Sequence, residues 1–115
     1  MNKRQMGSAY EQTAAAFLTG EGYRILEKNY RCRAGEIDLI AKNDGYLVFV
    51  EVKYRRDASM GDALAAVTPQ KQERIRKTAA WYLIRNGYSE ETPCRFDVVG
   101  ITGTEITLVK DAFGI

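Results

Sequence analysis

The stretch EIDLIAKNDGYLVFVEVKY, residues 36–54, has the pattern of a β-hairpin. Two runs rich in β-branched and aromatic residues flank Asp44-Gly45, and Asp-Gly between such runs is a strong local signal for a tight turn. We therefore predict two antiparallel strands, at residues 36–42 and 46–54, joined by a turn at residues 43–45.

Upstream of the hairpin, the sequence predicts a helix and a third strand. Ser8 is a candidate N-cap for a helix at residues 9–19, where apolar side chains recur at helical spacing. A weak alternation of apolar and polar residues indicates a strand at residues 23–29. A basic turn at residues 31–35 then leads into the hairpin.

Downstream, a second helix and two more strands are predicted. Residues 55–67 are expected to form a loop, with a helical turn near residues 63–66. Thr68-Pro69 marks the start of the helix, because Thr is a good N-cap and Pro is favoured at the first helical position, and Asn86-Gly87 ends it. The remaining strands are expected at residues 94–101 and 105–110.

The resulting order, α-β-β-β-α-β-β, predicts one α/β domain over residues 1–115, in which helices flank a mixed sheet. The composition, 45% hydrophobic and 28% charged residues, is that of an ordinary globular protein. The longest strongly apolar run, residues 47–50, is far too short to span a bilayer, and no signal-peptide pattern is present. We therefore expect a cytoplasmic protein with no membrane partner.

The residue content also limits the chemistry. The chain has no histidine, which excludes a Ser-His-Asp triad, a Cys-His dyad and any His-bearing zinc site within it. Cys32 and Cys94 are too few for an all-cysteine zinc site or a disulfide-rich scaffold. Catalysis by this chain would therefore depend on carboxylates, lysines, hydroxyls and a hard metal ion.

The predicted turn fixes which side chains face each other. With Asp44-Gly45 as a two-residue turn, Asp38 lies opposite Glu51 and Glu36 lies opposite Lys53. Because side chains alternate along a strand, these four share one face. A three-residue turn without a bulge would move Glu51 to the apolar face, where its burial would be unfavourable. The apolar face is expected to pack against a helix and consists of Ile37 with Val52, Leu39 with Val50, and Ala41 with Val48.

Two carboxylates on one face suggest a bound cation. The Cβ atoms of Asp38 and Glu51 would lie about 5 Å apart, and facing like charges destabilise a hairpin unless one is protonated or a cation lies between them. Lys53 could supply part of that positive charge, and Mg²⁺ or Mn²⁺ could supply the rest. Each residue alone fits a solvated strand face with a weak ion pair, but their combination favours a functional site.

Two further positions have both a structural and a functional interpretation. Glu11 has capping-box spacing from Ser8, but it could also project towards the carboxylate pair as an outer metal ligand. Gln70 and Lys71 lie in the first turn of the second helix, where Lys71 opposes the helix dipole. A phosphate bound at that helix end would relieve the mismatch, whereas an exposed surface lysine is the structural alternative.

Basic residues surround the acidic candidates. An acidic cleft within a basic surface is what a metal-dependent enzyme acting on a polyanion needs, although a charged helix face is more often only solvated. The candidate nucleic-acid-binding residues are Arg31, Arg33, Arg55, Arg56, Lys71, Arg74 and Lys77. The aromatic residues that could stack on bases or belong to the core are Tyr10, Tyr30, Tyr46, Tyr54, Tyr82 and Trp81.

Two motifs in the hairpin resemble the signature of a known family. GEIDLIA at residues 35–41 and FVEVKYR at residues 49–55 resemble the bacterial YraN family. That family is similar to the restriction-endonuclease-like PD-(D/E)xK superfamily and to archaeal Holliday-junction resolvases. The likeness covers nearly the whole chain, and its other positions are Glu11, Gly22-Tyr23, Asn29, Lys71 and residues 95–99.

The resemblance implies a restriction-endonuclease-like fold and a role for each site residue. Asp38 and Glu51 would bind Mg²⁺ with help from the backbone carbonyl of Val52, and Lys53 would orient or help deprotonate the attacking water. Glu11 would be a further metal ligand. The auxiliary candidates are Glu11, Glu36, Gln70 and Lys71.

These observations predict a metal-dependent endonuclease that hydrolyses phosphodiester bonds of DNA, including branched or junction DNA. The alternative is a nucleic-acid-binding module of the same fold without significant turnover. A third class is a protein-interaction or structural domain in which the acids only pair with lysines. An enzyme that cuts junctions would be expected to act as a two-fold homodimer, so that two strands are cut symmetrically.

Overall fold

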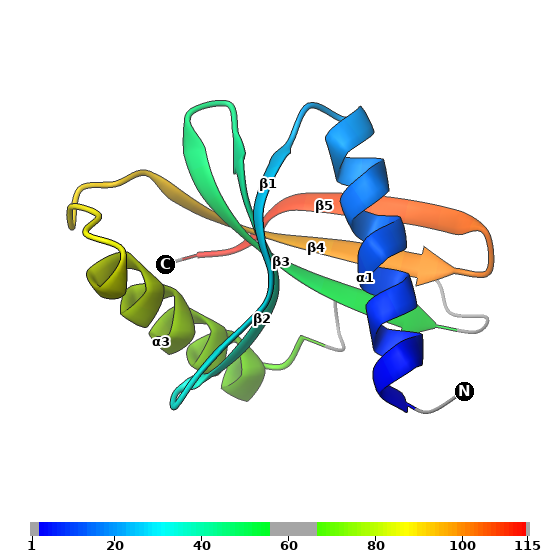
Figure 1. Ribbon diagram of the computed structural model, residues 1–115, viewed down its shortest axis with the longest axis horizontal. Helices are drawn as coiled ribbons and strands as arrows, with labels where there is room; N and C mark the ends of the chain where they lie inside the picture. Colours follow the sequence, from blue (N-terminus) through cyan, green and yellow to red (C-terminus); the bar gives the residue numbers. More distant parts are fainter. Residues whose placement is uncertain (1–2, 56–66, 115) are drawn as a thin grey trace.

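In the described part of the computed structural model, two helices lie against one twisted five-stranded sheet (Figure 1). The structure describes residues 3–55 and 67–114. The elements follow the predicted order and are α1 (Lys3–Gly20), β1 (Arg24–Cys32), β2 (Gly35–Asn43), β3 (Tyr46–Arg55), α3 (Pro69–Arg85), β4 (Cys94–Thr102) and β5 (Glu105–Phe113). The predicted α/β class and the predicted mixed sheet are both confirmed.

The sheet is mixed because of the crossover through α3. The strand order is β1-β2-β3-β4-β5. Neighbouring strands are antiparallel except for β3 and β4, which run parallel on either side of the α3 connection. β3 is thus a central strand, flanked by β2 on one side and by β4 on the other.

Each face of the sheet is covered by one helix (Figure 1). The cluster beneath α1 contains Leu18 together with Val48 and Val50 of β3. The cluster beneath α3 contains Ile75 together with Phe49 of β3. Alternate residues of β3 therefore pack on opposite faces, which explains why residues 47–50 form a continuous apolar run.

The predicted hairpin turn is confirmed. Asp44 and Gly45 both have positive φ, 51° and 83°, as a type I′ turn requires. The β2–β3 register runs from Asn43–Tyr46 to Leu39–Val50 as predicted. The start of α3 is also as predicted, since the Thr68 side chain accepts a hydrogen bond from the Lys71 N–H at 3.2 Å.

The predicted N-cap of the first helix is wrong. Helix α1 begins at Lys3, so Ser8 lies inside the helix. A residue inside a helix cannot cap its start, and the capping-box interpretation of Glu11 fails with it. The helical turn expected near residues 63–66 lies outside the described residues.

The predicted pairing fails where β2 and β3 separate. The ladder ends at Leu39–Val50, and Figure 1 shows the N-terminal end of β2 beside α3, whereas the C-terminal end of β3 lies on the side of α1. Glu36 instead lies opposite Arg31 of β1, so its predicted pairing with Lys53 is wrong.

The face predicted to be wholly apolar is also split at this point. Ile37 packs in the cluster beneath α3, whereas Leu39 and Val52 pack in the cluster beneath α1. Strict alternation along β2 is therefore broken at Asp38. The predicted pair of Ile37 with Val52 does not form, because the two side chains lie on opposite faces of the sheet.

Candidate active site

Asp38 lies at the fork between β2 and β3. Its Oδ2 accepts a hydrogen bond from the backbone N–H of Val52 at 2.8 Å. Asp38 and Glu51 are 9% and 7% exposed, so both carboxylates are buried at the fork. The two side chains meet there, although the ladder ends one pair before them.

Two lysines neutralise Glu51. Lys71 Nζ lies 3.1 Å from Glu51 Oε1, and Lys53 Nζ lies 3.7 Å from the same oxygen. Lys53 comes from β3, two residues after Glu51, whereas Lys71 comes from the first turn of α3. The capping contact between Thr68 and the Lys71 backbone fixes the geometry of this first turn. The structure therefore brings Lys71 to the acid pair.

Burial and the neighbouring charges shift the pKa values of Asp38 and of both lysines. Burial, followed by the charge of Glu51, raises the pKa of Asp38 to about 7. Burial and the neighbouring Lys71 lower the pKa of Lys53. Burial opposes the charged form of Lys71 as well, but its contact with Lys53 and the charge of Glu51 outweigh this and raise its pKa. The site therefore favours a charged Lys71 beside a more easily deprotonated Lys53.

Glu11 of α1 faces the same acids. Its side chain is buried, and its Oε2 atom has no hydrogen-bond partner. Burial and then the charge of Asp38 raise the pKa of Glu11, while a hydrogen bond with Asn29 of β1 lowers it. Asn29 has a φ of 55°, in the left-handed region that Asn tolerates better than most residues. Glu11 is thus a buried carboxylate with one oxygen free to accept.

The acids open into two cavities. A cavity of about 590 Å³ lies between the β1–β2 hairpin and the N-terminal half of α3, and it includes Asp38, Glu51 and Lys71. A cavity of about 380 Å³ on the α1 side is lined by Tyr10, Glu11, Glu36, Asp38, Glu51, Val52, Lys53, Tyr54 and Lys71. The rings of Tyr10 and Tyr54 stack at a centroid distance of 4.2 Å beside the second cavity. The site is therefore accessible from two sides.

The remaining predicted site residues surround these cavities. Glu36 lines both but is half-exposed and pairs with Arg31, at 2.7 Å from Arg31 Nε. Gln70, Arg74 and Arg31 line the larger cavity.

Three of the predicted nucleic-acid-binding residues that the structure describes do not line these two cavities. Arg33 lines a neighbouring cavity instead. Arg55 and Lys77 are exposed, at the end of β3 and on α3 respectively, and border neither cavity. Arg56 lies outside the described residues.

The acids alone do not form a complete metal cage. Within residues 3–55 and 67–114, no group of three or more His, Cys, Asp or Glu side chains is arranged to hold a metal ion. Mg²⁺ does not need such a cage, because it commonly uses one or two carboxylates and fills its other positions with water and phosphate oxygens. Asp38, Glu51 and the free oxygen of Glu11 are donors of the type that it prefers.

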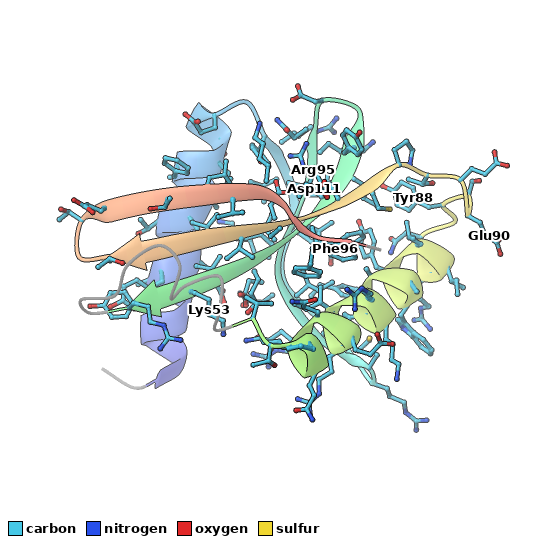
Figure 2. All side chains as sticks on the ribbon, turned by 180° about the vertical axis from the view of Figure 1, so that it is seen from behind. Lys53, Tyr88, Glu90, Arg95, Phe96 and Asp111 are labelled. Carbon is cyan, nitrogen blue, oxygen red and sulfur yellow. The ribbon has the colours of Figure 1, made fainter. Side chains whose placement is uncertain are left out.

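Sequence reasoning did not predict a buried polar network on the α1 face of the sheet. Arg95 donates two hydrogen bonds to Asp97, both at 2.9 Å, and one each to Tyr23 and Asn43. The Tyr23 hydroxyl donates to Asp97 at 2.6 Å, and the Asp111 backbone N–H donates to its other oxygen. Figure 2 shows Arg95 and Asp111 away from Lys53, so the network is separate from the acid pair. The sequence signal for this network is the pair of opposite charges, Arg95 and Asp97, two residues apart in the otherwise apolar strand β4.

Comparison with known proteins identifies the family. The model of the uncharacterised protein family UPF0102 matches residues 10–101. The chain belongs to family UPF0102. This confirms the resemblance to YraN, because UPF0102 protein YraN of Escherichia coli is 46% identical over 114 residues, which cover 98% of this chain and 87% of that protein.

Other UPF0102 relatives match over similar lengths. A UPF0102 protein of Lachnoclostridium phytofermentans is 54% identical over 113 residues, covering 98% of this chain and 96% of the relative. One from Klebsiella pneumoniae is 51% identical over 112 residues, covering 96% and 88%. The likeness thus includes α1, the fork and α3. In the part of the chain that the structure describes, no helix is long and apolar enough to cross a membrane.

Proposed function

We propose that this chain is a metal-dependent nuclease that hydrolyses phosphodiester bonds of DNA, with branched or junction DNA as a candidate substrate. One observation carries the proposal: Asp38 and Glu51 are buried together at the fork, with Lys53 and Lys71 beside Glu51. The resemblance to PD-(D/E)xK nucleases points in the same direction. This arrangement has the acids, the amines and the open cavity that phosphodiester hydrolysis needs.

The donors support Mg²⁺ or Mn²⁺ as the cofactor. Asp38 and Glu51 would hold the ion, with Glu11 as a further oxygen ligand and the carbonyl of Val52 assisting. A divalent cation at this place would lower the raised pKa of Asp38 and would give the Glu11 Oε2 atom a partner. When bound, such an ion lowers the pKa of water and withdraws electron density from a phosphate oxygen.

The lysines have complementary roles in this mechanism. Lys53, whose pKa is lowered, orients the attacking water and helps to remove its proton. The water oxygen forms a bond to phosphorus while the bond from phosphorus to the leaving sugar oxygen breaks. Lys71 keeps its charge and stabilises the negative charge that develops on the phosphate.

The surrounding basic residues support a polyanionic substrate. Arg31 and Arg74 line the cavity beside the acids, and Arg33, in the turn between β1 and β2, lines the adjoining cavity. Arg55 is exposed at the end of β3 but borders neither cavity beside the acids. Contacts from such residues to phosphates would give salt-dependent binding independent of sequence.

A cleavage assay tests this proposal directly. End-labelled linear, flapped and four-way DNA, and linear RNA, are incubated with Mg²⁺, Mn²⁺ or EDTA. Asp38→Asn is the decisive variant, because its amide oxygen can still accept the hydrogen bond from the Val52 N–H, so we expect the fold to be retained. Asp44→Asn in the exposed hairpin turn is its matched control, since Asn is well suited to a positive φ.

Each outcome has a defined meaning. Metal-dependent cleavage that survives in Asp44→Asn but is lost in Asp38→Asn and Glu51→Gln supports the proposal. Cleavage retained in Asp38→Asn rejects this site. Salt-sensitive binding without cleavage of any substrate replaces the nuclease with a nucleic-acid-binding module. The ion pairs of Lys53 and Lys71 with Glu51 are compatible with that alternative, because they neutralise Glu51 without a metal ion. Neither cleavage nor binding rejects both functions.

A further inference from the structure

A third cavity lies next to the acidic one. It has a volume of about 640 Å³ and lies between β1 and the C-terminal half of α3. Its lining includes Glu27, Tyr30, Arg33, Trp81 and Arg85. Arg31 and Cys32 also line the cavity that contains Asp38, so the two cavities adjoin. We call this third cavity the Trp81 cavity.

Two arginines in the Trp81 cavity are free to bind an anion. Arg31 is already paired with Glu36 at 2.7 Å. Among the residues that the structure describes, neither Arg33 nor Arg85 has a carboxylate within 4.0 Å, and both side chains are exposed. Exposed guanidinium groups without a carboxylate partner are suited to bidentate contacts with phosphate oxygens.

The cavity also presents one exposed aromatic ring. Trp81 is 41% exposed and lies four residues before Arg85, on the same side of α3. Tyr30, the other aromatic residue of this cavity, is engaged edge-on with the buried Tyr82 at a centroid distance of 5.1 Å. Trp81 is thus the ring available for stacking, and an indole face binds any nucleobase that is not already stacked on both sides.

We propose that the Trp81 cavity binds an unpaired nucleotide, with its base on Trp81 and its phosphates on Arg33 and Arg85. This inference rests on the proposed action on nucleic acid and narrows the substrate to one with a single-stranded segment. A base inside a duplex is stacked on both faces and cannot reach the ring. The two unpaired guanidinium groups favour a polyanion, and an acidic protein segment is the alternative occupant that the test below distinguishes.

The spacing of Lys71 and Trp81 along α3 sets the expected distance between the cleaved bond and the unpaired nucleotide. Lys71 and Trp81 are ten residues apart on one helix, which corresponds to about 15 Å, or about four stacked nucleotides. The unpaired nucleotide is therefore expected within about four nucleotides of the cleaved bond. A flap or the arm of a branched DNA has such a segment, whereas a continuous duplex does not.

The chain contains one tryptophan, so tryptophan fluorescence reports on Trp81 alone. The full-length Asp38→Asn protein is titrated in EDTA with a 16-residue oligothymidylate, a duplex of equal length and an abasic oligomer of equal charge. We expect stacking to quench the fluorescence with oligothymidylate but not with the abasic oligomer or the duplex. Fluorescence anisotropy of labelled DNA measures binding independently.

Variants separate the base contact from the phosphate contacts. Trp81→Ala is expected to weaken oligothymidylate binding about 10-fold, the size of one base–aromatic stack, while Trp81→Phe keeps most of the affinity. Ile84→Ala, at a 76% exposed position of the same helix, is the control and should change nothing. Arg33→Ala with Arg85→Ala should weaken binding and reduce its salt dependence by about two phosphate contacts.

The outcomes distinguish this inference from the proposed function. Oligothymidylate that binds by anisotropy without changing the fluorescence overturns the Trp81 site but leaves the nuclease intact. Equal quenching by the duplex, or by an acidic peptide of the same charge, also overturns it. Quenching and the Trp81→Ala effect in a protein that cuts no substrate with any metal support the Trp81 site and overturn the nuclease.

Discussion

Asp38 Oδ2 accepts a hydrogen bond from the backbone N–H of Val52 at 2.8 Å, immediately beyond the last pair of the β2–β3 ladder, Leu39–Val50. The Asp38 side chain therefore accepts the hydrogen bond that a backbone carbonyl of β2 would accept if the ladder continued. This keeps the Val52 N–H satisfied where the strands separate, and it fixes the orientation of the carboxylate before any ligand binds. The fork and the placement of Asp38 thus have one structural cause.

We expect the metal-free protein to lose stability as the pH rises. The folded-state pKa of Asp38, about 7, lies above its unfolded value of about 4, so the folded protein holds this proton more tightly. Stability from Asp38 is full below about pH 4 and is lost by about pH 7. Between pH 5 and 8 in EDTA, urea denaturation should show a fall of about 1–3 kcal/mol that Asp38→Asn lacks. A wild-type protein whose difference from Asp38→Asn stays constant with pH would contradict this.

The hairpin could be predicted because its determinants are local. Asp44 and Gly45 accept the positive φ of a type I′ turn, and the turn then fixes the register as far as Leu39–Val50. The start of α3 is local in the same way, since Thr68 and Pro69 act on the first turn alone. The order of elements followed from such signals, one element at a time.

The fork could not be predicted in this way, because it depends on distant strands. Beyond Val50, β3 remains paired with β4, where Glu51 lies beside Val98. The N-terminal end of β2 remains paired with β1 instead. The register set by the turn predicts a pair of Glu36 with Lys53 only if the ladder continues beyond Leu39–Val50. The ladder stops there, and Glu36 lies beside Arg31 of β1. Asp38 lies where the two strands stop pairing, but a single acid in an apolar strand does not by itself predict such a fork.

The orientation of Glu11 was ambiguous in the sequence for a related reason. Its spacing from Ser8 fits a capping box, which is a local rule. The helix extends to Lys3, so the rule does not apply, and packing of α1 on the sheet turns Glu11 towards Asp38. Which side of a helix faces a site is a tertiary property that helix-capping patterns do not contain.

Removing Lys71 should improve metal binding while impairing cleavage. Its amine lies 3.1 Å from Glu51 Oε1, where its charge repels an incoming cation. Lys71→Met should therefore bind Mn²⁺ about 3- to 10-fold more tightly, roughly 1 kcal/mol for a partly exposed charge, by calorimetry without DNA. Lys77→Met, an exposed change on the same helix, should leave Mn²⁺ affinity unaltered. Weaker Mn²⁺ binding in Lys71→Met would show that this lysine does not compete for Glu51.

Breaking the buried network should destabilise the fold more than any single site change. Arg95 is 8% exposed and Asp97 is 1% exposed, so Asp97→Ala would leave a buried guanidinium without its counter-charge. We expect a loss of about 3–5 kcal/mol in urea denaturation. Tyr23→Phe removes only the hydroxyl and should cost about 1–2 kcal/mol. Equal costs for the two changes would argue against a charged network.

Gly35, in the β1–β2 hairpin that lies against α3, is expected to be hard to replace. Its φ is 154°, and an added Cβ would lie 3.0 Å from Thr78 Oγ1, whose own hydrogen bond to the Arg74 carbonyl at 2.7 Å limits its freedom to move. Gly35→Ala should therefore cost about 1–3 kcal/mol and shift the β1–β2 hairpin away from α3, which widens the cavity beside Asp38. Gly20→Ala is the matched control, because nothing lies within 4 Å of a Cβ there, and its effect should stay within about 0.5 kcal/mol. Thermal unfolding measures both, and a Gly35→Ala protein as stable as Gly20→Ala would mean that α3 and the hairpin are not in close contact at Thr78.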